Sequence, residues 1–160
     1  MFKYHMTKAE REVTGGEELR GLLKRGKYAS IALCRHNEPY IVTLSYGYDE
    51  KNGRLYFHTA NKGLKLDFLK ENSNVCATVI EDGGYIKDQC SHRYFSVVLW
   101  GEMTLISDLE EKKHAMEVLL NHLEDNPGPI KERNLPHDAS YNGVALLRLT
   151  VRQLTGKRGS

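Results

Sequence analysis

The sequence lacks several features that would assign it to large protein classes. No apolar run reaches the roughly 18 residues that a membrane-spanning helix needs, so we expect no membrane partner. Residues 1–5 have no apolar core of the kind that signal peptides carry, and we therefore expect a cytoplasmic protein. The Gly-x-Gly-x-x-Gly and Gly-x-x-x-x-Gly-Lys-Ser/Thr motifs are also absent, which argues against Rossmann dinucleotide-binding and P-loop folds.

Cysteine is scarce, with three residues in the chain. An odd number of cysteines without a spacing pattern is a poor disulfide framework and favours a reducing compartment. Cys34 and Cys76 lie in strand-like runs, where we expect them to be small core residues. Cys90 and His92 could bind a metal ion, but no second Cys or His pair follows at a metal-site spacing, so we expect no metal.

Neither sign of charge is in large excess. The 23 Lys and Arg residues against 21 Asp and Glu residues give a net charge of +2 at pH 7. Nucleic-acid-binding domains usually have a strong basic excess, so we expect no nucleic-acid partner. At 160 residues the chain is long enough for one core, and we expect a single domain over residues 1–160.

The chain does contain short β-branched and aromatic runs at hairpin spacing. Beyond the Tyr40–Lys65 stretch described below, we expect strands near Tyr28–Cys34, Val75–Ile80, Arg93–Ile106 and Gly143–Val151, with a bulge or bend at Gly101. The segment from Asp82 to Ser91 is expected to be a loop. Strands at this spacing with few helices favour a mainly β barrel over a parallel α/β sheet.

Helices are expected after two capping boxes, at Thr14–Glu17 and Ser107–Glu110. The second helix carries an apolar stripe for core or dimer packing. Asn126–Tyr141 holds three of the four prolines and is expected to be a crossing loop.

One stretch combines a hairpin with a candidate anion site. We expect strands at Tyr40–Tyr48 and Leu55–Thr59, paired across a turn that contains Asn52-Gly53. A helix over Lys62–Lys70 follows, with Lys62 and Lys65 in its first turn. Cations there oppose the helix dipole unless an anion binds at the free N–H groups. The stretch is therefore either a phosphate cradle or a surface turn with two solvated lysines.

The same stretch resembles a known family. The order Tyr-Ile-Val-x-Leu-Ser-Tyr-Gly-Tyr, Leu-Tyr-Phe-His-x-Ala-x-x-Gly-x-Lys and later Ser96-Val97-Val98-Leu99-Trp100-Gly101 is similar to the pyridoxamine 5'-phosphate oxidase-related flavoproteins, and closest to their nitroimidazole-resistance-type branch. The resemblance covers about Tyr28 to Lys157. It implies a mainly β, FMN-binding split β-barrel, antiparallel and Greek-key-like, with a few peripheral helices. It also implies a homodimer with the flavin at the subunit interface.

The resemblance further implies which segments hold FMN. A strand is expected at the edge of the flavin ring, a strand–turn–helix block at the phosphate and ribityl chain, and two residues of a later strand near the ring or the interface. These are, in order, Val42, Thr43, Leu44 and Ser45; His58, Thr59, Ala60, Lys62, Gly63 and Lys65; and Ser96 and Trp100. Many relatives have Pro where this chain has Thr43. Without the family, the hydroxyls would be ordinary strand residues, Trp100 a core residue and His58 a structural histidine.

The expected function is that of an FMN-dependent oxidoreductase acting on a small molecule, with nitro compounds as the first substrate class and His58 as the candidate catalytic residue. Oxidation of B6 vitamers is a weaker alternative, because the end of the chain, Leu147–Lys157, does not show the substrate-binding pattern of that enzyme. A third alternative is a non-catalytic split barrel that binds flavin, haem or a deazaflavin for sensing or storage.

Overall fold

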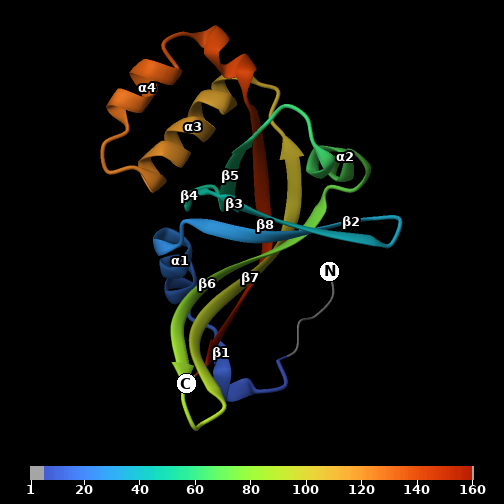
Figure 1. The fold of residues 1–160 in the computed structure, drawn as a ribbon, viewed down its shortest axis with the longest axis vertical. Helices are drawn as coiled ribbons and strands as arrows, with labels where there is room; N and C mark the ends of the chain where they lie inside the picture. Colours follow the sequence, from blue (N-terminus) through green and yellow to red (C-terminus); the bar gives the residue numbers. More distant parts are fainter. Residues whose placement is uncertain (1–5, 160) are drawn as a thin grey trace.

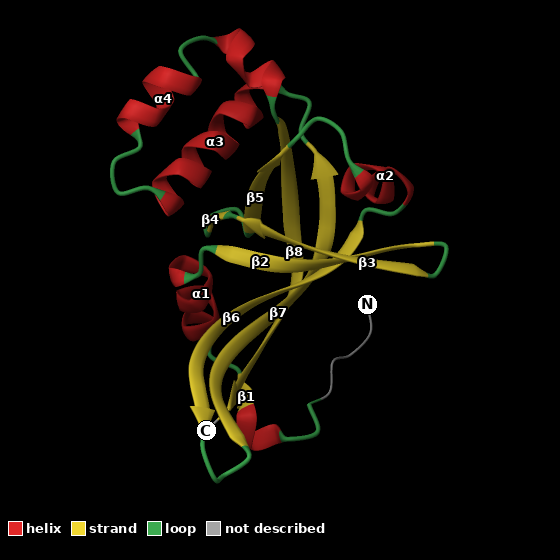
Figure 2. Cartoon of the chain, viewed as in Figure 1, coloured by secondary structure: helices red, strands yellow, loops and turns green. Residues whose placement is uncertain are grey.

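The computed structural model describes residues 6–159, in which one antiparallel sheet holds the other elements together (Figures 1 and 2). The strand order is β3-β2-β6-β7-β8-β5-β4, and β1 pairs with β8. The strands are β1 (Glu12–Val13), β2 (Tyr28–Arg35), β3 (Glu38–Ser45), β4 (Gly47–Asp49), β5 (Arg54–Thr59), β6 (Asn74–Ile86), β7 (Ser91–Leu105) and β8 (Ala145–Gly159). The prediction of a mainly β, antiparallel fold is confirmed. The expectation about a signal peptide at residues 1–5 falls outside the described residues.

The helices lie around this sheet. Their bounds are η1 (Ala9–Arg11), α1 (Gly16–Arg25), α2 (Leu64–Glu71), α3 (Leu109–Leu123), α4 (Gly128–Asn134) and η2 (Asp138–Gly143). Figure 1 shows α2, α3 and α4 at one end of the molecule, whereas the β6–β7 hairpin and the end of β8 form the opposite end. Within residues 6–159, none of the helices has the length and apolar character required to cross a membrane.

Side-chain alternation along the strands divides the sheet into an inner and an outer face. In β2, for example, Ala29, Ile31 and Leu33 are buried while Ser30 and Ala32 are not. The inner-face residues form the main core together with α1 and α2. A second, smaller core lies on the outer face, where α3 covers Tyr56 of β5 and Leu146 of β8. Most of the outer face of β3, β2, β6 and β7 is left without a covering helix (Figure 2).

The expected hairpin at Tyr40–Thr59 is wrong in its pairing. The chain breaks the first strand at Tyr46, whose hydroxyl donates to the carbonyl of Leu23 across 2.7 Å. The part before Tyr46 is β3, which pairs with β2, and only Gly47–Asp49 pairs with β5. Burial of an aromatic ring inside the core therefore overrides the local strand pattern at this position.

Several other local expectations are also corrected. The segment after Asp82 is not a loop, because β6 continues to Ile86 through a bulge and pairs with β7. The crossing loop contains α4 and η2. Gly15 caps α1 without a side-chain hydrogen bond, so Thr14 forms no capping box. The second predicted box is also displaced, because Asp108 and not Ser107 caps α3, accepting the N–H of Glu111 across 2.8 Å. The irregularity predicted at Gly101 is confirmed as a register shift between Trp100 and Gly101.

Candidate functional site

The end of β5 and the start of α2 form the candidate anion site. Lys65 Nζ donates to Thr59 Oγ1 across 2.9 Å, so its ammonium group lies beside the end of the strand. Gly63, the cap of α2, has a φ of 144°, a conformation that residues with a Cβ rarely adopt. Its carbonyl accepts the N–H of Leu66 across 2.9 Å. The N–H groups of the two preceding helix residues have no acceptor within residues 6–159, and they are available to an anion.

The flanking charges differ from the sequence expectation. The helix begins at Leu64, so Lys62 precedes its first turn and is exposed, as is Ala60. Asp67 lies in the first turn and offsets part of the unfavourable interaction between Lys65 and the helix dipole. The case for an anion site therefore rests on the ammonium group and the free N–H groups, rather than on an uncompensated pair of lysines.

The strand β3 presents its polar side chains on the outer face. Thr43 and Ser45 are exposed, and Thr43 Oγ1 lies 2.9 Å from Ser30 Oγ of β2. Val42 and Leu44 point the other way and pack against the main core. Because β3 ends the strand order, one of its edges has no paired strand among the described residues, and its backbone groups are free to bind a ligand.

Ser96 and Trp100 lie on the same outer face but on β7. Ser96 Oγ is 3.5 Å from the carbonyl of Lys157, and Trp100 is half-buried opposite Cys76 of β6. Two strands, β2 and β6, separate β3 from β7. Three inter-strand spacings amount to roughly 14 Å. One chain therefore does not bring these two residues next to Thr43 and Ser45, although all four share one face.

His58 opens onto an apolar cavity. It is exposed and lies on the face of β5 opposite Thr59, and its ring makes no hydrogen bond within residues 6–159. The cavity has a volume of about 430 Å³. Its walls come from α3, α4 and η2 and are mostly apolar, with Met116, Leu119, Leu120, Leu123, Ile130 and Leu135 among them. An unpartnered imidazole beside an apolar wall can orient a small polar or aromatic molecule.

Sequence reasoning missed a polar pair behind this cavity. Asp49, 8% exposed at the end of β4, accepts from His114 of α3, whose Nε2 lies 2.8 Å from Oδ2. Burial alone would raise the pKa of Asp49, but hydrogen bonds from Asn52 and His114 outweigh it and lower that pKa. The His114 ring meets Tyr56 edge-on at 5.6 Å. The Asp49–His114 pair fixes α3, a wall of the His58 cavity, to β4. No sequence pattern indicates this pair, because it forms only when α3 packs on β4.

Two of the cysteines do not have the core positions expected of them. Cys34 is exposed and Cys76 is half-buried on the outer face of β6. Burial raises the pKa of the Cys76 thiol, so it stays protonated and weakly nucleophilic at neutral pH. We assign neither residue a chemical role.

Comparison with protein families gives one match that covers most of the chain. The model of the pyridoxamine 5'-phosphate oxidase family matches residues 16–158. The uncharacterised protein RA0666 of Rhizobium meliloti (strain 1021) is 33% identical over 69 residues. That match spans 43% of this chain and 44% of the length of the curated relative.

Comparison with solved structures supports the same fold. A candidate 5-nitroimidazole antibiotic resistance protein of Bacteroides thetaiotaomicron is 23% identical, with a TM-score of 0.78, over 99% of this chain and 96% of its own. The FAD- and haem-binding protein of Mycobacterium smegmatis is 22% identical, with a TM-score of 0.77, over 94% of this chain and 74% of its own. The predicted split-barrel architecture is thereby confirmed.

Proposed function

The chain belongs to the pyridoxamine 5'-phosphate oxidase family, and we propose that it is a flavoprotein that binds FMN and reduces a small molecule. The observation that carries this proposal is the contact between Lys65 Nζ and Thr59 Oγ1 beside the free N–H groups at the start of α2. This arrangement offers one cation and backbone donors to one terminal phosphate. FMN has such a phosphate, whereas riboflavin has none and FAD has an internal pyrophosphate.

The remaining predicted contacts lie on the outer face of the sheet. The free edge of β3, with the hydroxyls of Thr43 and Ser45, would hold the polar edge of the flavin ring. In a homodimer, Ser96 and Trp100 of the partner subunit would cover it, since within one chain β2 and β6 lie between β3 and β7. The exposed outer face of the sheet is the surface that such a partner would cover.

We further propose that the acceptor binds at the His58 cavity. A bound flavin supplies the redox chemistry. The chain itself contributes an apolar wall that limits water and the imidazole of His58 as the candidate proton donor. Nitroaromatic compounds suit this combination, because they are flat and their reduction consumes protons. The structural similarity to a candidate 5-nitroimidazole resistance protein supports the choice.

The activity is tested by anaerobic stopped flow with the chemically reduced, FMN-loaded protein. We expect nitroimidazole to reoxidise the bound flavin faster than it reoxidises free reduced FMN. The His58→Ala variant should lower that rate while retaining FMN, and His92→Ala, at the far end of the sheet, should not. A rate no greater than that of free reduced FMN would reject the reductase proposal.

A second candidate is a non-catalytic protein that binds flavin or haem. It is favoured by the unpartnered His58 ring at an apolar cavity, and by similarity to an FAD- and haem-binding protein. The absorption spectrum of the purified protein, reconstituted separately with FMN, FAD and haem, shows which cofactor binds. A Soret band lost in His58→Ala would support haem binding, whereas flavin bands fit both candidates, and the stopped-flow rate then decides between them.

A further inference from the structure

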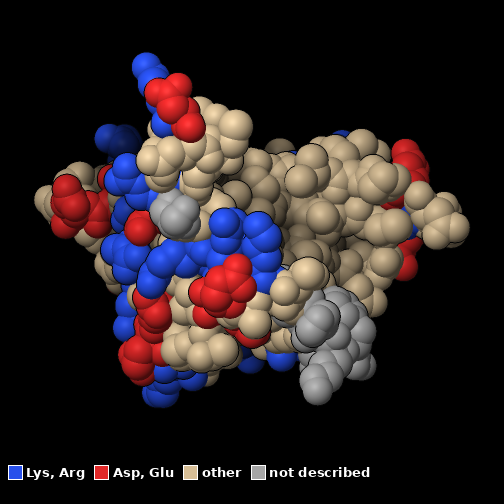
Figure 3. Space-filling model, turned by 90° about the horizontal axis from the view of Figure 1, so that it is seen from below, with Lys and Arg blue, Asp and Glu red and all other residues tan. Residues whose placement is uncertain are grey.

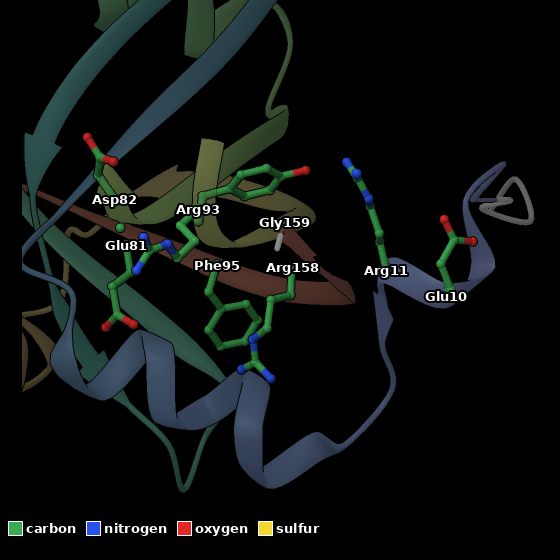
Figure 4. A pocket seen from close by; sticks show the side chains of 10 residues that line it. Glu10, Arg11, Glu81, Asp82, Arg93, Phe95, Arg158 and Gly159 are labelled. Atoms are coloured by element: carbon green, nitrogen blue, oxygen red, sulfur yellow. The ribbon is translucent and has the colours of Figure 1, made fainter. Parts of the chain in front are cut away.

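The cavity at the opposite end of the sheet from α2 and α3 has balanced charges. It has a volume of about 810 Å³, and residues of η1, β6, β7 and β8 line it, three of them acidic and three basic. Figure 4 shows Arg93 directed toward Glu81, and Glu10 next to Arg11 on η1. Figure 3 shows acidic side chains among the basic ones at this end of the molecule. We therefore assign this cavity no ligand.

The turn between β5 and α2 contains one residue that reaches outside the anion site. Asn61 lies two residues after Thr59 and two before Gly63. Its Nδ2 donates to the carbonyl of Asn142 in η2 across 3.1 Å, although the two residues are 81 apart in the sequence. The strand β8 follows η2, and its first residue, Ala145, pairs with Thr59. The turn and η2 therefore lie side by side at the same end of the sheet.

The 3-10 helix η2 also forms part of the wall of the His58 cavity. Ser140 and Gly143 line that cavity. Three other residues of η2 line a second cavity, of about 200 Å³, between η2 and the start of α3. None of the η2 residues is buried. Because a segment between two cavities has few packed neighbours, a small number of polar contacts determines its position.

Two polar side-chain contacts join η2 to the rest of the protein. One is the hydrogen bond from Asn61, and the other is an ion pair of 3.0 Å between Asp138 and Lys113 of α3. Within residues 6–159, no other side-chain hydrogen bond or ion pair connects η2 to another element. The ion pair is partly exposed, and such pairs contribute little to stability. Asn61 is therefore the contact through which the turn before α2 can position η2.

We propose that Asn61 is a positioning residue that links the anion site to the His58 cavity. An anion held by Lys65 and the free N–H groups of α2 fixes the turn between Thr59 and Gly63, on both sides of Asn61. The amide of Asn61 then holds Asn142, and the η2 wall of the cavity becomes more ordered. The anion acts by stabilising one conformation of the turn and the wall together. This inference rests on the proposed function, because it assigns regulation to the same anion site and cavity.

Hydrogen–deuterium exchange of the full chain tests the link, read by mass spectrometry on the peptide that covers η2. The protein is measured alone and with an excess of FMN, riboflavin or inorganic phosphate. We expect FMN and phosphate to slow exchange in η2 by about two- to tenfold, which corresponds to one hydrogen bond. Riboflavin has no phosphate and should slow it less than FMN does.

Matched asparagine variants make the assignment specific. Asn61→Ala should speed exchange in η2 and abolish the effects of FMN and phosphate on it, while FMN still binds. Asn61→Gln keeps an amide donor and should restore part of both effects. Asn72→Ala is the control, because it removes a hydrogen bond of the same kind, from Nδ2 to the carbonyl of Cys34 across 2.9 Å, at the other end of α2. It should leave the response of η2 unchanged.

A separate titration of FMN allows this inference and the proposed function to fail independently. Absence of FMN binding would reject the flavoprotein proposal, whereas inorganic phosphate would still test the link. Exchange in η2 that responds to neither FMN nor phosphate would overturn the inference. An equal response in the wild type and in Asn61→Ala would also overturn it, because the order of η2 would then not depend on this hydrogen bond.

Discussion

At the scale of single residues, Lys65 carries the phosphate assignment. Replacing it with alanine removes the cation beside Thr59 and should weaken FMN binding by roughly ten- to a hundredfold, since a charge-assisted contact contributes about 1.5–3 kcal/mol. Riboflavin has no phosphate, so its affinity should hardly change. Fluorescence titration of both ligands measures the difference. The control is Lys70→Ala, an exposed lysine in the last turn of the same helix. Equal losses for FMN and riboflavin would remove Lys65 from the phosphate role.

The Asp49–His114 pair makes a separate prediction about acid stability. Because the pKa of Asp49 is lowered in the folded protein, the unfolded chain takes up this proton first as the pH falls. The contribution to stability is therefore complete above about pH 4 and is lost as the pH falls through the lower, folded-state pKa. Asp49→Asn should lower the free energy of unfolding at pH 7 by about 1–3 kcal/mol and should flatten its decline below pH 4.

Urea unfolding at pH 7, 4 and 3 measures this effect, with the exposed Asp125→Asn as the control. If Asp49→Asn and Asp125→Asn lose the same stability at every pH, the buried pair contributes no pH-dependent stability.

The predictability of the site also differs from residue to residue. Lys65 and Thr59 could be paired from the sequence, because a strand end and a helix start only six residues apart must lie close together. The outward alternation of Thr43 and Ser45 likewise follows from strand geometry. The Asp49–His114 contact joins residues 65 apart, and no local pattern indicates it. The Asp49–His114 contact depends on how α3 packs on β4, which the sequence does not specify locally.

At the scale of elements, predictions made from local residue types failed where contacts with distant parts of the chain determine the structure. Gly83 and Gly84 suggested the end of a strand, yet β7 supplies partners on both sides of them and the strand continues as a bulge. The prolines of residues 126–141 suggested a loop, but Pro129 lies in the first turn of α4, where the missing N–H costs nothing. The apolar stripe of α3 and the irregularity at Gly101 were local signals, and both were predicted correctly.

The contact between α3 and β4 can be tested through Gly47. A Cβ at this position would lie 2.7 Å from both the Cα and the N of Leu119, so Gly47→Ala must push the helix away from the strand. We expect a loss of about 1–3 kcal/mol in the free energy of unfolding. The same substitution at Gly21, inside α1 and near only the flexible end of Arg25, should stabilise by about 0.5–1 kcal/mol. Chemical denaturation of both variants checks the contrast, and equal effects would contradict the close approach.

At the scale of the whole molecule, the uncovered outer face of the sheet predicts a homodimer. Three large apolar side chains on this face are more than half exposed: Tyr28 at 61%, Ile41 at 67% and Ile80 at 56%. They lie on the neighbouring strands β2, β3 and β6, on the side that also carries Thr43, Ser96 and Trp100. Contiguous exposed apolar surface on a sheet favours association. A dimer would also bring the β7 residues of one chain to the β3 edge of the other, which one chain alone does not do.

Light scattering should therefore give about twice the mass of the 18.3 kDa chain. Ile41→Glu combined with Ile80→Glu places charges in the proposed interface and should shift the mass toward one chain, because desolvating an unpaired carboxylate costs several kcal/mol. FMN affinity should fall with it, since the proposed contacts of Ser96 and Trp100 come from the partner. Leu105→Glu is the control, as this residue is 57% exposed but lies at the α3 end of β7. A wild-type protein that scatters as a single chain while FMN stays tightly bound would reject the interface site and leave the β3 edge and α2 as the whole of the flavin site.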